Sequence, residues 1–574
     1  MRLGWSGKGA VRSFYVYKSA YVNGKRTTVM VEKLGSSTSI CEKYGVDDAE
    51  QWCRDYIEKL NRAAKEKAEP VMVSFRPDHL IEKNAQNRYN VGYLFLQQIY
   101  YRLGLHSISR AVAHKHGTEY DLNSILSRLV YSRILFPASK LATYELSRRY
   151  VEQHSFDAHQ VYRALSVIAE ENDYIQSRLY RNSQKISKRS TGVIFYDCTN
   201  FYYEIEEEDS FRKYGVSKEH RPNPIVQMGL FMDYNGMPLA FSMNPGSTNE
   251  QLTLQPLEEK LMADFGLSKF VVCTDAGLSS IDNRKYNSSG QRAFVTTQSI
   301  KKLKGHLKKW ALAKEGWHLD EDDTSYDIGS IDEEAHLKSI FFKDRWINED
   351  GFEQHLIVTY SPKTKRYQRA VRQRQIDRAR AALDKGEKIE KKRQTDYKRL
   401  IKKQTCTKDG EKTTHTFYEL DEAKIAEEEK YDGFYGTCTN LEDDAVSIVN
   451  INHHRWEIEE CFRIMKTGFH SRPVYLSRED RIKAHFMTCF IALLIYRYLE
   501  KELDEKYTCE EIMDTLRSMD MVKLEGQGWI PAYMRTEITD RLHEKFGFRT
   551  DHEILTPKNM KKICADTKKN NNNA

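Results

Sequence analysis

The first sixty residues change from a strand pattern to a helical pattern. Two β-rich runs, 13–22 and 27–34, flank Asn23-Gly24, a residue pair that favours a type I′ turn. An aspartate at 47 or 48 is then a good helix N-cap, and aromatic and apolar positions recur every four residues after it. This part of the chain is therefore predicted to form a hairpin followed by a helix.

Residues 93–188 have a helical period and a single proline, Pro137. That proline falls between the apolar-periodic runs 125–136 and 140–149, so it is expected to separate two helices. Arg and Lys recur on the polar faces of this region. Such faces are ordinarily solvated helix surface, but they also suit a helical domain that contacts DNA, and the pattern leaves both interpretations open.

The period changes to strand after residue 190. Two of the expected strands end at an aspartate, Asp197 and Asp275, and two flank Asn235-Gly236, another hairpin pair. The order is three strands, a helix and two strands, as in an RNase H-like α/β sheet with helices on its faces. The expected strands are 193–196, 225–233, 237–243, 270–274 and 292–297, and the expected helix is 254–265.

The regular pattern is interrupted between about 300 and 430. Between residues 363 and 403 there are 17 Lys and Arg against 5 Asp and Glu. Such a cluster favours a phosphate-binding surface through counterion release, although a charged surface helix or a mobile arm has the same composition. Beyond it we expect a strand at 433–438, a helix at 446–467, and a helix at 485–503 that is apolar on most sides and so buried.

Composition narrows the class of protein. A chain of 574 residues suggests three or four structural units, and 40% apolar with 30% charged residues excludes collagen-like, coiled-coil and wholly disordered proteins. The net charge of +7 matters only where it clusters. Ten cysteines without a C-x2-C or C-x4-C pair argue against a zinc ribbon or a disulfide scaffold. With no signal-peptide core and no apolar stretch of about 20 residues, we expect a soluble intracellular protein.

One predicted helix carries an acid and two bases on a common face. At about 100° per residue, Arg455, Glu459 and Lys466 fall within about 40° of one another. Taken alone, Arg455 and Glu459 are most simply an i, i+4 ion pair on a surface, worth a few tenths of a kcal/mol.

The two strand-end aspartates add a second interpretation. An ionised carboxylate after an apolar strand is costly unless it is paired, exposed or bound to a metal. In an RNase H-like sheet the first and fourth strands are neighbours, so Asp197 and Asp275 would lie side by side and Glu459 could approach from the later helix. Three converging carboxylates suit two Mg²⁺ or Mn²⁺ ions, which assist phosphoryl transfer. With 83 acidic residues, many such triples are possible, and the residues alone do not decide.

Several blocks together resemble the signature of bacterial insertion-sequence DDE transposases, in the insertion sequence four-like group with Y-x2-R-x3-E-x6-K. Arg455, Glu459 and Lys466 match that spacing. The resemblance extends over most of 10–505. The other similar blocks are L-G at 34–35, Y-D-C-T-N-F at 196–201, T-D-A-G at 274–277, G-F-Y-G-T-C-T-N at 433–440, R-P-V-Y at 472–475 and R-I-K-A-H at 481–485.

The resemblance implies roles for these residues. Asp197, Asp275 and Glu459 would be the catalytic triad that binds two Mg²⁺ or Mn²⁺ ions, while the bases of the motif would hold phosphates of the transposon end. The motif's tyrosine is replaced here by Asn452, which puts in doubt a ring contact with the cleaved strand and the hairpin-forming route of some relatives. The DNA-binding candidates are Arg455, Lys466, Arg463, Asn452 and Arg472.

Relatives of this group carry an insertion of strands before the glutamate, which fits 300–430. Trp310, Trp317 or Trp346 could there stabilise a flipped base, although each is more simply a core or surface residue.

The expected activity is cut-and-paste transposition, that is, metal-dependent DNA cleavage and strand transfer at the ends of an insertion sequence. The alternatives are a nuclease of the same fold without strand transfer and an inactive DNA-binding relative. The expected partners are double-stranded DNA and a second copy of the chain at paired ends, in the bacterial cytoplasm near the nucleoid, with no membrane.

The expected domains are a hairpin plus helix (1–85), a helical DNA-binding region (86–190), an RNase H-like core in two parts (191–300 and 431–505) around an insertion (301–430), and a helical C-terminal region with a polar tail (506–574).

Overall fold

The computed structural model divides the chain into two compact units, Met1–Ala85 and Gln86–Ala574. It describes residues 1–7, 12–22, 25–66, 72–73, 77–78, 80–320, 322–349, 351–385, 396–405, 416–472 and 474–569.

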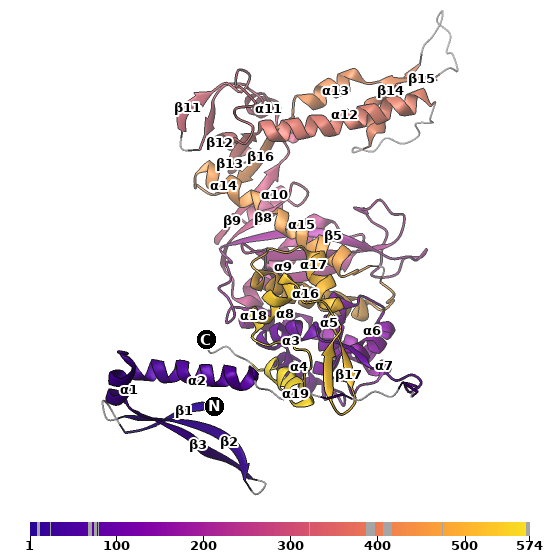
Figure 1. The fold of residues 1–574 in the computed structure, drawn as a ribbon. Coiled ribbons are helices and arrows are strands. Elements are labelled where there is room, and N and C mark those ends of the chain that lie inside the picture. The colour runs from indigo at the N-terminus through magenta and orange to yellow at the C-terminus, as the bar shows by residue number, and fades with distance from the viewer. Residues whose placement is uncertain are drawn as a thin grey trace, which may run out of the picture. The chain divides into compact units, whose positions relative to one another are not determined.

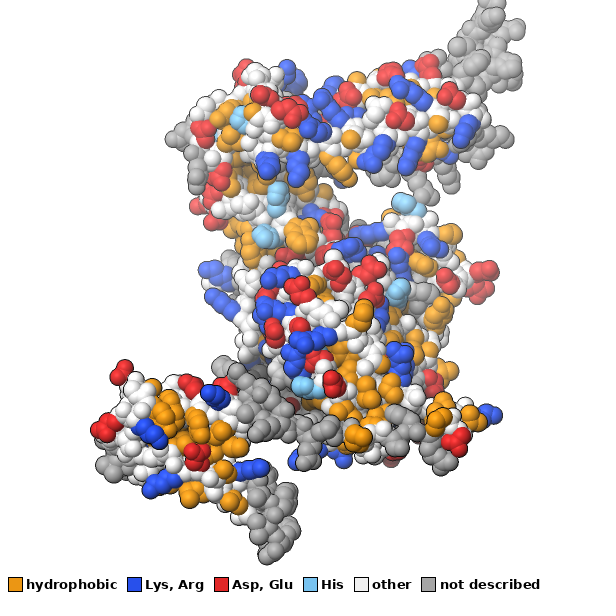
Figure 2. All heavy atoms as spheres, in the orientation of Figure 1, with side chains coloured by type: hydrophobic (Ala, Val, Ile, Leu, Met, Phe, Trp, Pro, Cys, Tyr) orange, Lys and Arg blue, Asp and Glu red, His pale blue; other side chains and the backbone are white. Residues whose placement is uncertain are grey.

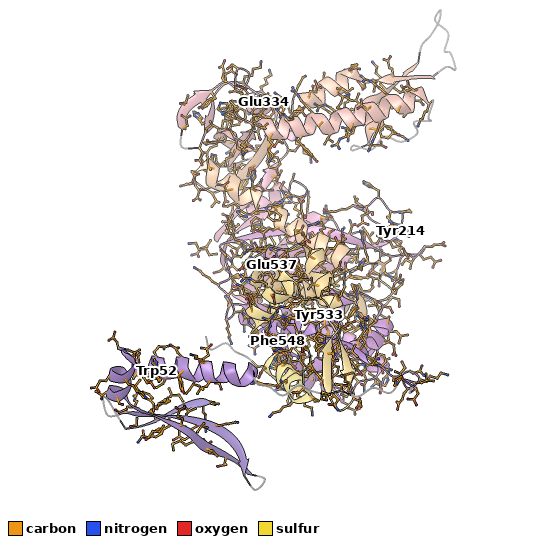
Figure 3. The ribbon with its side chains drawn as sticks, in the orientation of Figure 1. Trp52, Tyr214, Glu334, Tyr533, Glu537 and Phe548 are labelled. Atoms are coloured by element: carbon orange, nitrogen blue, oxygen red, sulfur yellow. The ribbon has the colours of Figure 1, made fainter. Side chains whose placement is uncertain are left out.

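The first unit contains the expected hairpin and helix. Strands β1 (Arg2–Ser6), β2 (Ser13–Val22) and β3 (Lys25–Ser36) pair antiparallel, and helices α1 (Ser37–Tyr44) and α2 (Ala49–Glu66) follow (Figure 1). The predicted Asn23-Gly24 turn lies outside the described residues. The Asp48 carboxylate accepts from two backbone N–H groups of the first turn of α2, as an N-cap does. Trp52 on α2 stacks between two tyrosines and closes this small core (Figure 3).

The second unit begins with a short strand that the sequence did not predict, and continues with the predicted helical region. The apolar faces of its helices share one core with the sheet described next. Pro137 lies between the fifth and sixth helices of the chain, where the sequence placed a break. The elements are β4 (Arg88–Asn90), α3 (Tyr93–Arg102), α4 (Leu105–His116), α5 (Leu122–Leu135), α6 (Lys140–Leu146), α7 (Ala158–Glu170) and α8 (Asn172–Ser183).

Ten of the described strands form one mixed sheet, which confirms the RNase H-like fold. Its core has the order β7-β6-β5-β8-β9, so the first and fourth strands of the core are neighbours, and they pair in parallel. Helix α9 (Leu254–Phe265) has the predicted bounds. The core strands are β5 (Val193–Tyr202), β6 (Ile225–Asp233), β7 (Pro238–Pro245), β8 (Lys269–Thr274) and β9 (Gln291–Gln298), with α10 (Ile281–Tyr286) between the last two.

Strand β5 is longer than the sequence indicated. It continues to Tyr202, so Asp197 lies within the strand and not at its end, opposite Leu230 of β6. Its parallel neighbour β8 stops at Thr274, and their pairing ends at Phe195 and Cys273. Asp197 is therefore paired on one side only, because β6 extends past the point where β8 ends.

The insertion extends the same sheet. Strands β10 (Trp317–Leu319), β11 (Asp322–Tyr326), β12 (Phe341–Glu349) and β13 (Phe352–Tyr360) continue it beyond β16 (Phe434–Thr439), which pairs with β9. Helix α11 (Gly305–Ala311) precedes them. Between β13 and β16 the chain forms α12 (Pro362–Asp384), the hairpin β14 (Ile401–Thr405) and β15 (Thr416–Leu420), and α13 (Glu422–Glu429).

The basic cluster of the insertion is partly neutralised. Figure 2 shows basic and acidic side chains interleaved over α12 and its neighbours. Arg372 on α12 makes a buried pair with Asp432, and Lys365 pairs with Glu333. Arg366 pairs with Glu334 in the same way. The local excess of positive charge counted along 363–403 is thus reduced by acids from outside that segment.

The predicted helix 446–467 is three segments, not one. Helix α14 (Ala445–His453) ends and α15 (Trp456–Arg463) begins after a break at His454, where successive N–H groups bond three residues back instead of four. A π-helical turn, Ile464–Gly468, follows α15. Each departure from the 3.6-residue period rotates the side chains that follow. A single helical wheel therefore cannot give the relative directions of Arg455, Glu459 and Lys466.

The last segments enclose the core. Helix α16 (Glu479–Glu502) is long and apolar enough to cross a membrane by length and composition, but 94% of its most apolar window is buried inside the protein, as predicted. Helix α17 (Cys509–Ser518), strands β17 (Asp520–Leu524) and β18 (Gly528–Pro531), and helices α18 (Glu537–Phe546) and α19 (Pro557–Asp566) follow. Strand β17 pairs with β4, and Tyr533, Glu537 and Phe548 mark this region in Figure 3. The predicted tail beyond residue 569 lies outside the described residues.

Candidate active site

Asp197 and Asp275 come from neighbouring parallel strands. The register of β5 and β8 pairs Phe195 with Cys273, and continuing it by two residues brings Asp197 level with Asp275. The two charges interact, because Asp275 is among the causes that raise the pKa of Asp197. The structure therefore brings these two predicted carboxylates together.

Asp197 is held in a nearly buried position. The residue is only 9% exposed, and its Oδ1 accepts a 2.7 Å hydrogen bond from the Cys198 N–H. Burial raises the pKa of Asp197 to about 6, and the ammonium of Lys218, 4.0 Å from Oδ1, opposes that rise. A carboxylate in this environment is stabilised by any further cation placed beside it.

Asp275 occupies the turn that follows β8. Its Oδ1 accepts from the backbone N–H groups of Gly277 and Leu278, each at 3.0 Å. These bonds fix the orientation of the carboxylate by local backbone geometry. Two hard oxygen donors side by side, one of them nearly buried, fit a Mg²⁺ or Mn²⁺ ion.

Glu459 reaches this pair of carboxylates through Arg455. Arg455 Nη2 lies 3.6 Å from Glu459 Oε1, the i, i+4 pair that the sequence predicted. The pKa of Arg455 is raised by Asp275 and Asp197 among other groups, so its guanidinium lies within electrostatic reach of both. The Glu459 side chain itself is 66% exposed. In the described part of the chain no three acidic, His or Cys side chains are arranged to hold a metal, so the complete triad stays a prediction.

Arg455 is fixed from the opposite side by the sheet. Its Nη1 donates a 3.0 Å hydrogen bond to Thr297 Oγ1 at the end of β9, and the same hydroxyl is 2.8 Å from the Tyr435 hydroxyl on β16. Burial lowers the pKa of Arg455, and among the groups that raise it Tyr435 has the largest effect. The guanidinium is thus held in place by two strands.

Lys466 lies near Asp197 on another side, and Arg472 is joined to Lys466 through a shared carboxylate. Lys466 lies in the π-helical turn, 3.4 Å from Glu219 Oε1, and Arg472 pairs with the same carboxylate. Burial lowers the pKa of Lys466 to about 8, with a further contribution from Lys218, while Asp197 opposes it. Lys466 therefore lies close enough to Asp197 to interact electrostatically with it, as the motif implies.

The other two DNA-binding candidates have different surroundings. Asn452 is nearly buried, donates to Thr437 Oγ1 at 3.3 Å and accepts from the Cys273 thiol at 3.7 Å, so it ties α14 to the sheet. Arg463 is exposed and paired with Glu460. Their proposed contact with DNA stays a prediction.

The sequence did not single out three charged residues of this site. Lys218 lies 3.5 Å from Glu250 and donates to the Cys198 carbonyl, and Glu219 joins Lys466 to Arg472. Lys218 and Glu219 belong to the connection between β5 and β6, and Glu250 to a single 3-10 turn. Neither stretch has a periodic pattern from which the site could have been inferred.

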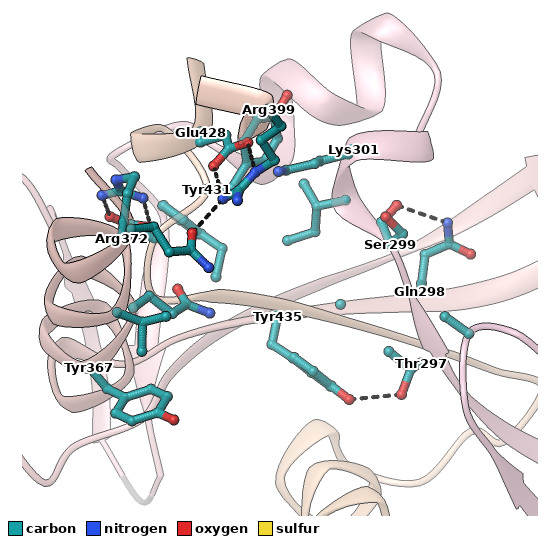
Figure 4. A pocket seen from close by; sticks show the side chains of 18 residues that line it. Thr297, Gln298, Ser299, Lys301, Tyr367, Arg372, Arg399, Glu428, Tyr431 and Tyr435 are labelled. Atoms are coloured by element: carbon teal, nitrogen blue, oxygen red, sulfur yellow. Dashed lines mark hydrogen bonds and ion pairs between the residues drawn. The ribbon is translucent and has the colours of Figure 1, made fainter. Parts of the chain in front are cut away.

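A cavity of about 520 Å³ borders the site on the side of the insertion (Figure 4). Thr297, which Arg455 contacts, and Tyr435 line it together with other residues of β9, β16, α12 and α13. Both of its arginines are paired with acids, Arg372 with Asp432 and Arg399 with Glu428. Of the three candidate tryptophans, Trp317 is fully buried in the core of the insertion and none lines this cavity.

Comparison with known proteins gives one family match. Residues 188–495, more than half of the chain, match the family model described as "Transposase DDE domain". Among solved structures the chain is similar to one titled "Cryo-EM structure of piggyBac transposase synaptic complex with hairpin DNA", with 8% identity and a TM-score of 0.36 over 83% of this chain and 84% of that one. No curated protein matches the chain.

Proposed function

Because this chain belongs to the transposase DDE domain family, we propose that it is a bacterial cut-and-paste transposase of the insertion-sequence group with Y-x2-R-x3-E-x6-K. It cleaves double-stranded DNA at the ends of its element and joins the freed ends to a target. The observation that supports this most directly is the position of Asp197 beside Asp275, with Arg455 linking them to Glu459.

The acidic residues of the site and Arg455 would have different roles. Asp197, Asp275 and Glu459 would hold two Mg²⁺ or Mn²⁺ ions, which supply Lewis-acid stabilisation to the attacking and leaving oxygens. For Glu459 to take part, its exposed carboxylate must leave Arg455 and turn toward the aspartates. Arg455 is then free to hold a DNA phosphate, which replaces the lost carboxylate as its counter-ion.

Lys466 and Arg472 would contact the DNA backbone next to the cut. They already share Glu219 as counter-ion, so a phosphate that enters competes with one carboxylate for two cations. Two element ends must be handled together, so the working form is expected to be a homodimer on DNA in the bacterial cytoplasm.

Cleavage by active-site variants tests the proposal. Asp197→Asn and Glu459→Gln should each abolish Mg²⁺-dependent strand cleavage of element-end DNA while leaving binding of that DNA intact. Glu460→Gln, next to Glu459 but paired with Arg463, is the matched control and should cleave. Retained cleavage in either of the first two variants would refute the assignment.

A strand-transfer assay separates this proposal from a nuclease of the same fold. Precleaved ends that carry a 3′-hydroxyl should be joined to target DNA by the wild-type protein. If ends are cut but never joined, the protein is a nuclease, and if they are bound but never cut, it is an inactive relative.

A further inference from the structure

A second cavity, of about 400 Å³, lies between the helical region and the segment that follows the π-helical turn. Helices α5 and α6 and the loop between them form one side. The other side is formed by Tyr162 of α7, by His485 of α16, and by His470, Arg472 and residues 474–476. Its volume is within the roughly 300–1,000 Å³ range of small-ligand sites. Arg133, Lys140 and Arg472 line it, and none of the described residues that line it is acidic.

Two cations lie at the base of this cavity without an acidic partner. Lys140 is 5% exposed, and its Nζ has no hydrogen-bond partner. Arg133 is as deeply buried and donates only to backbone carbonyls, those of Phe469, His470 and Ala138, while its Nε is unpartnered. An unpaired buried ammonium is costly, so the lysine either gives up its proton or gains an anionic partner.

Lys343 shows how this fold accommodates a buried lysine that needs no ligand. It is as buried as Lys140, but its Nζ donates a 2.9 Å hydrogen bond to the Ala313 carbonyl and lies over the rings of Trp317 and Trp310. Lys140 has no such arrangement. Burial lowers the pKa of Lys140 to about 7, and after burial the nearby positive charge of Arg133 contributes most to this lowering.

The other titratable groups around Lys140 do not supply the missing negative charge. His485 on α16 donates through Nε2 to the Ser471 carbonyl, and burial together with Lys140 and Arg133 lowers its pKa well below the usual range, so it is neutral. The Cys489 thiol next to it has a raised pKa for the same reason of burial. The cavity is consequently a cationic site that an anion would complete.

Arg472 connects this cavity to the candidate active site. It lines the cavity, and it shares Glu219 with Lys466, which interacts electrostatically with Asp197. We propose that the Lys140–Arg133 cavity binds a phosphate group of the DNA backbone. This phosphate would be separated from the one at the candidate active site by Arg472 and Lys466. This inference rests on the proposed function for the identity of the anion, but not for the existence of the anion site.

Inorganic phosphate tests the site without DNA or activity. In a buffer with EDTA, the melting temperature of the full-length protein is compared in potassium phosphate and in potassium chloride of equal ionic strength. Phosphate should raise the melting temperature of the wild-type protein, since a ligand that binds only the folded state stabilises it. Lys140→Met should lose this shift, and Lys562→Met, at an exposed lysine of α19 outside the cavity, should keep it.

Folding of the key variant is checked in the same experiment. Lys140→Met removes an unpartnered ammonium and keeps a similar side-chain length, so in chloride it should melt no lower than the wild type. An equal phosphate shift in the wild type and in Lys140→Met would overturn the anion site.

The salt dependence of DNA binding then identifies the source of the phosphate. Removing one phosphate contact should reduce the slope of log K against log [salt] by about 0.9 in Lys140→Met, with no change in Lys562→Met. A Lys140-dependent phosphate shift with an unchanged slope would assign the cavity to free phosphate and overturn the DNA assignment. Neither readout involves cleavage, so a failure of the proposed activity would be seen separately, in the Asp197→Asn experiment.

Discussion

Glu258 should make the protein less stable as pH rises. This glutamate of α9 is fully buried, and Asn287, which ends α10, donates a 3.0 Å hydrogen bond to its Oε1. Glu258 Oε2 and Asn287 Oδ1 are both buried without a partner. A proton on Oε2 would let the acid donate to Oδ1, so one proton could satisfy both atoms. The pair joins two helices that flank the strand and turn leading to Asp275.

The size of the effect follows from the pKa. Burial raises the pKa of Glu258 from 4.5 to about 8, and the hydrogen bond from Asn287 only partly opposes this. Below pH 4.5 both the folded and unfolded chains carry the proton, and nothing is lost. Between pH 4.5 and 8 Glu258 ionises in the unfolded chain but not in the folded chain. The free energy of unfolding therefore falls by about 1.4 kcal/mol per pH unit, a total loss of about 5 kcal/mol.

Glu258→Gln should remove this dependence. The amide keeps the shape of the side chain, stays neutral, and can donate to Asn287 Oδ1. Thermal unfolding of wild type and variant should therefore nearly coincide at pH 5, with the variant increasingly more stable toward pH 9. Glu259→Gln, at the adjacent exposed position, should show no such trend. A difference between wild type and Glu258→Gln that is the same at pH 5 and pH 9 would refute the reasoning.

Two other substitutions test contacts that position the site. Tyr435→Phe removes the hydroxyl bonded to Thr297, which in turn holds Arg455; losing about 1 kcal/mol of positioning should slow cleavage roughly fivefold at an unchanged Kd for DNA, and an unchanged rate would contradict this role. Arg189→Met leaves the fully buried Asp233 carboxylate without its ion pair, which should cost about 3–5 kcal/mol in urea unfolding. Adding Asp233→Asn should restore part of that loss, and a loss below about 1 kcal/mol would contradict the prediction.

The parts of the fold that the sequence predicted well depend on local pattern. The hairpin at Asn235-Gly236 forms as expected, with Gly236 at a φ of 73° and its N–H bonded to the Asp233 carbonyl. Helix α9 has its predicted bounds because a glycine in the left-handed conformation, Gly266, ends it. Strand order also followed, since the sequence of element types is typical of one known sheet topology.

Errors occurred where a tertiary contact overrides the local period. The helical wheel for 446–467 assumed one helix, but burial of Asn452 against the sheet and a π-helical turn divide the segment. The charge count along 363–403 suggested a strongly basic surface, but acids distant in sequence, Glu333 and Asp432, pair with part of it. The partners in these contacts lie 15, 32 and 60 residues away along the chain, beyond the reach of the local pattern.

The element types, the RNase H-like order and the spacing of Arg455, Glu459 and Lys466 could be predicted from the chain, because they depend on side-chain period and on residues close together in it. Several of the charge contacts, in contrast, are set by tertiary packing. It joined Lys466 to Arg472 through Glu219, and it left Lys140 buried without a hydrogen-bond partner on a helix whose polar residues the pattern placed on a solvated or DNA-contacting surface. Burial and long-range pairing set the electrostatic cost of each charge, and neither can be read from the chain one residue at a time.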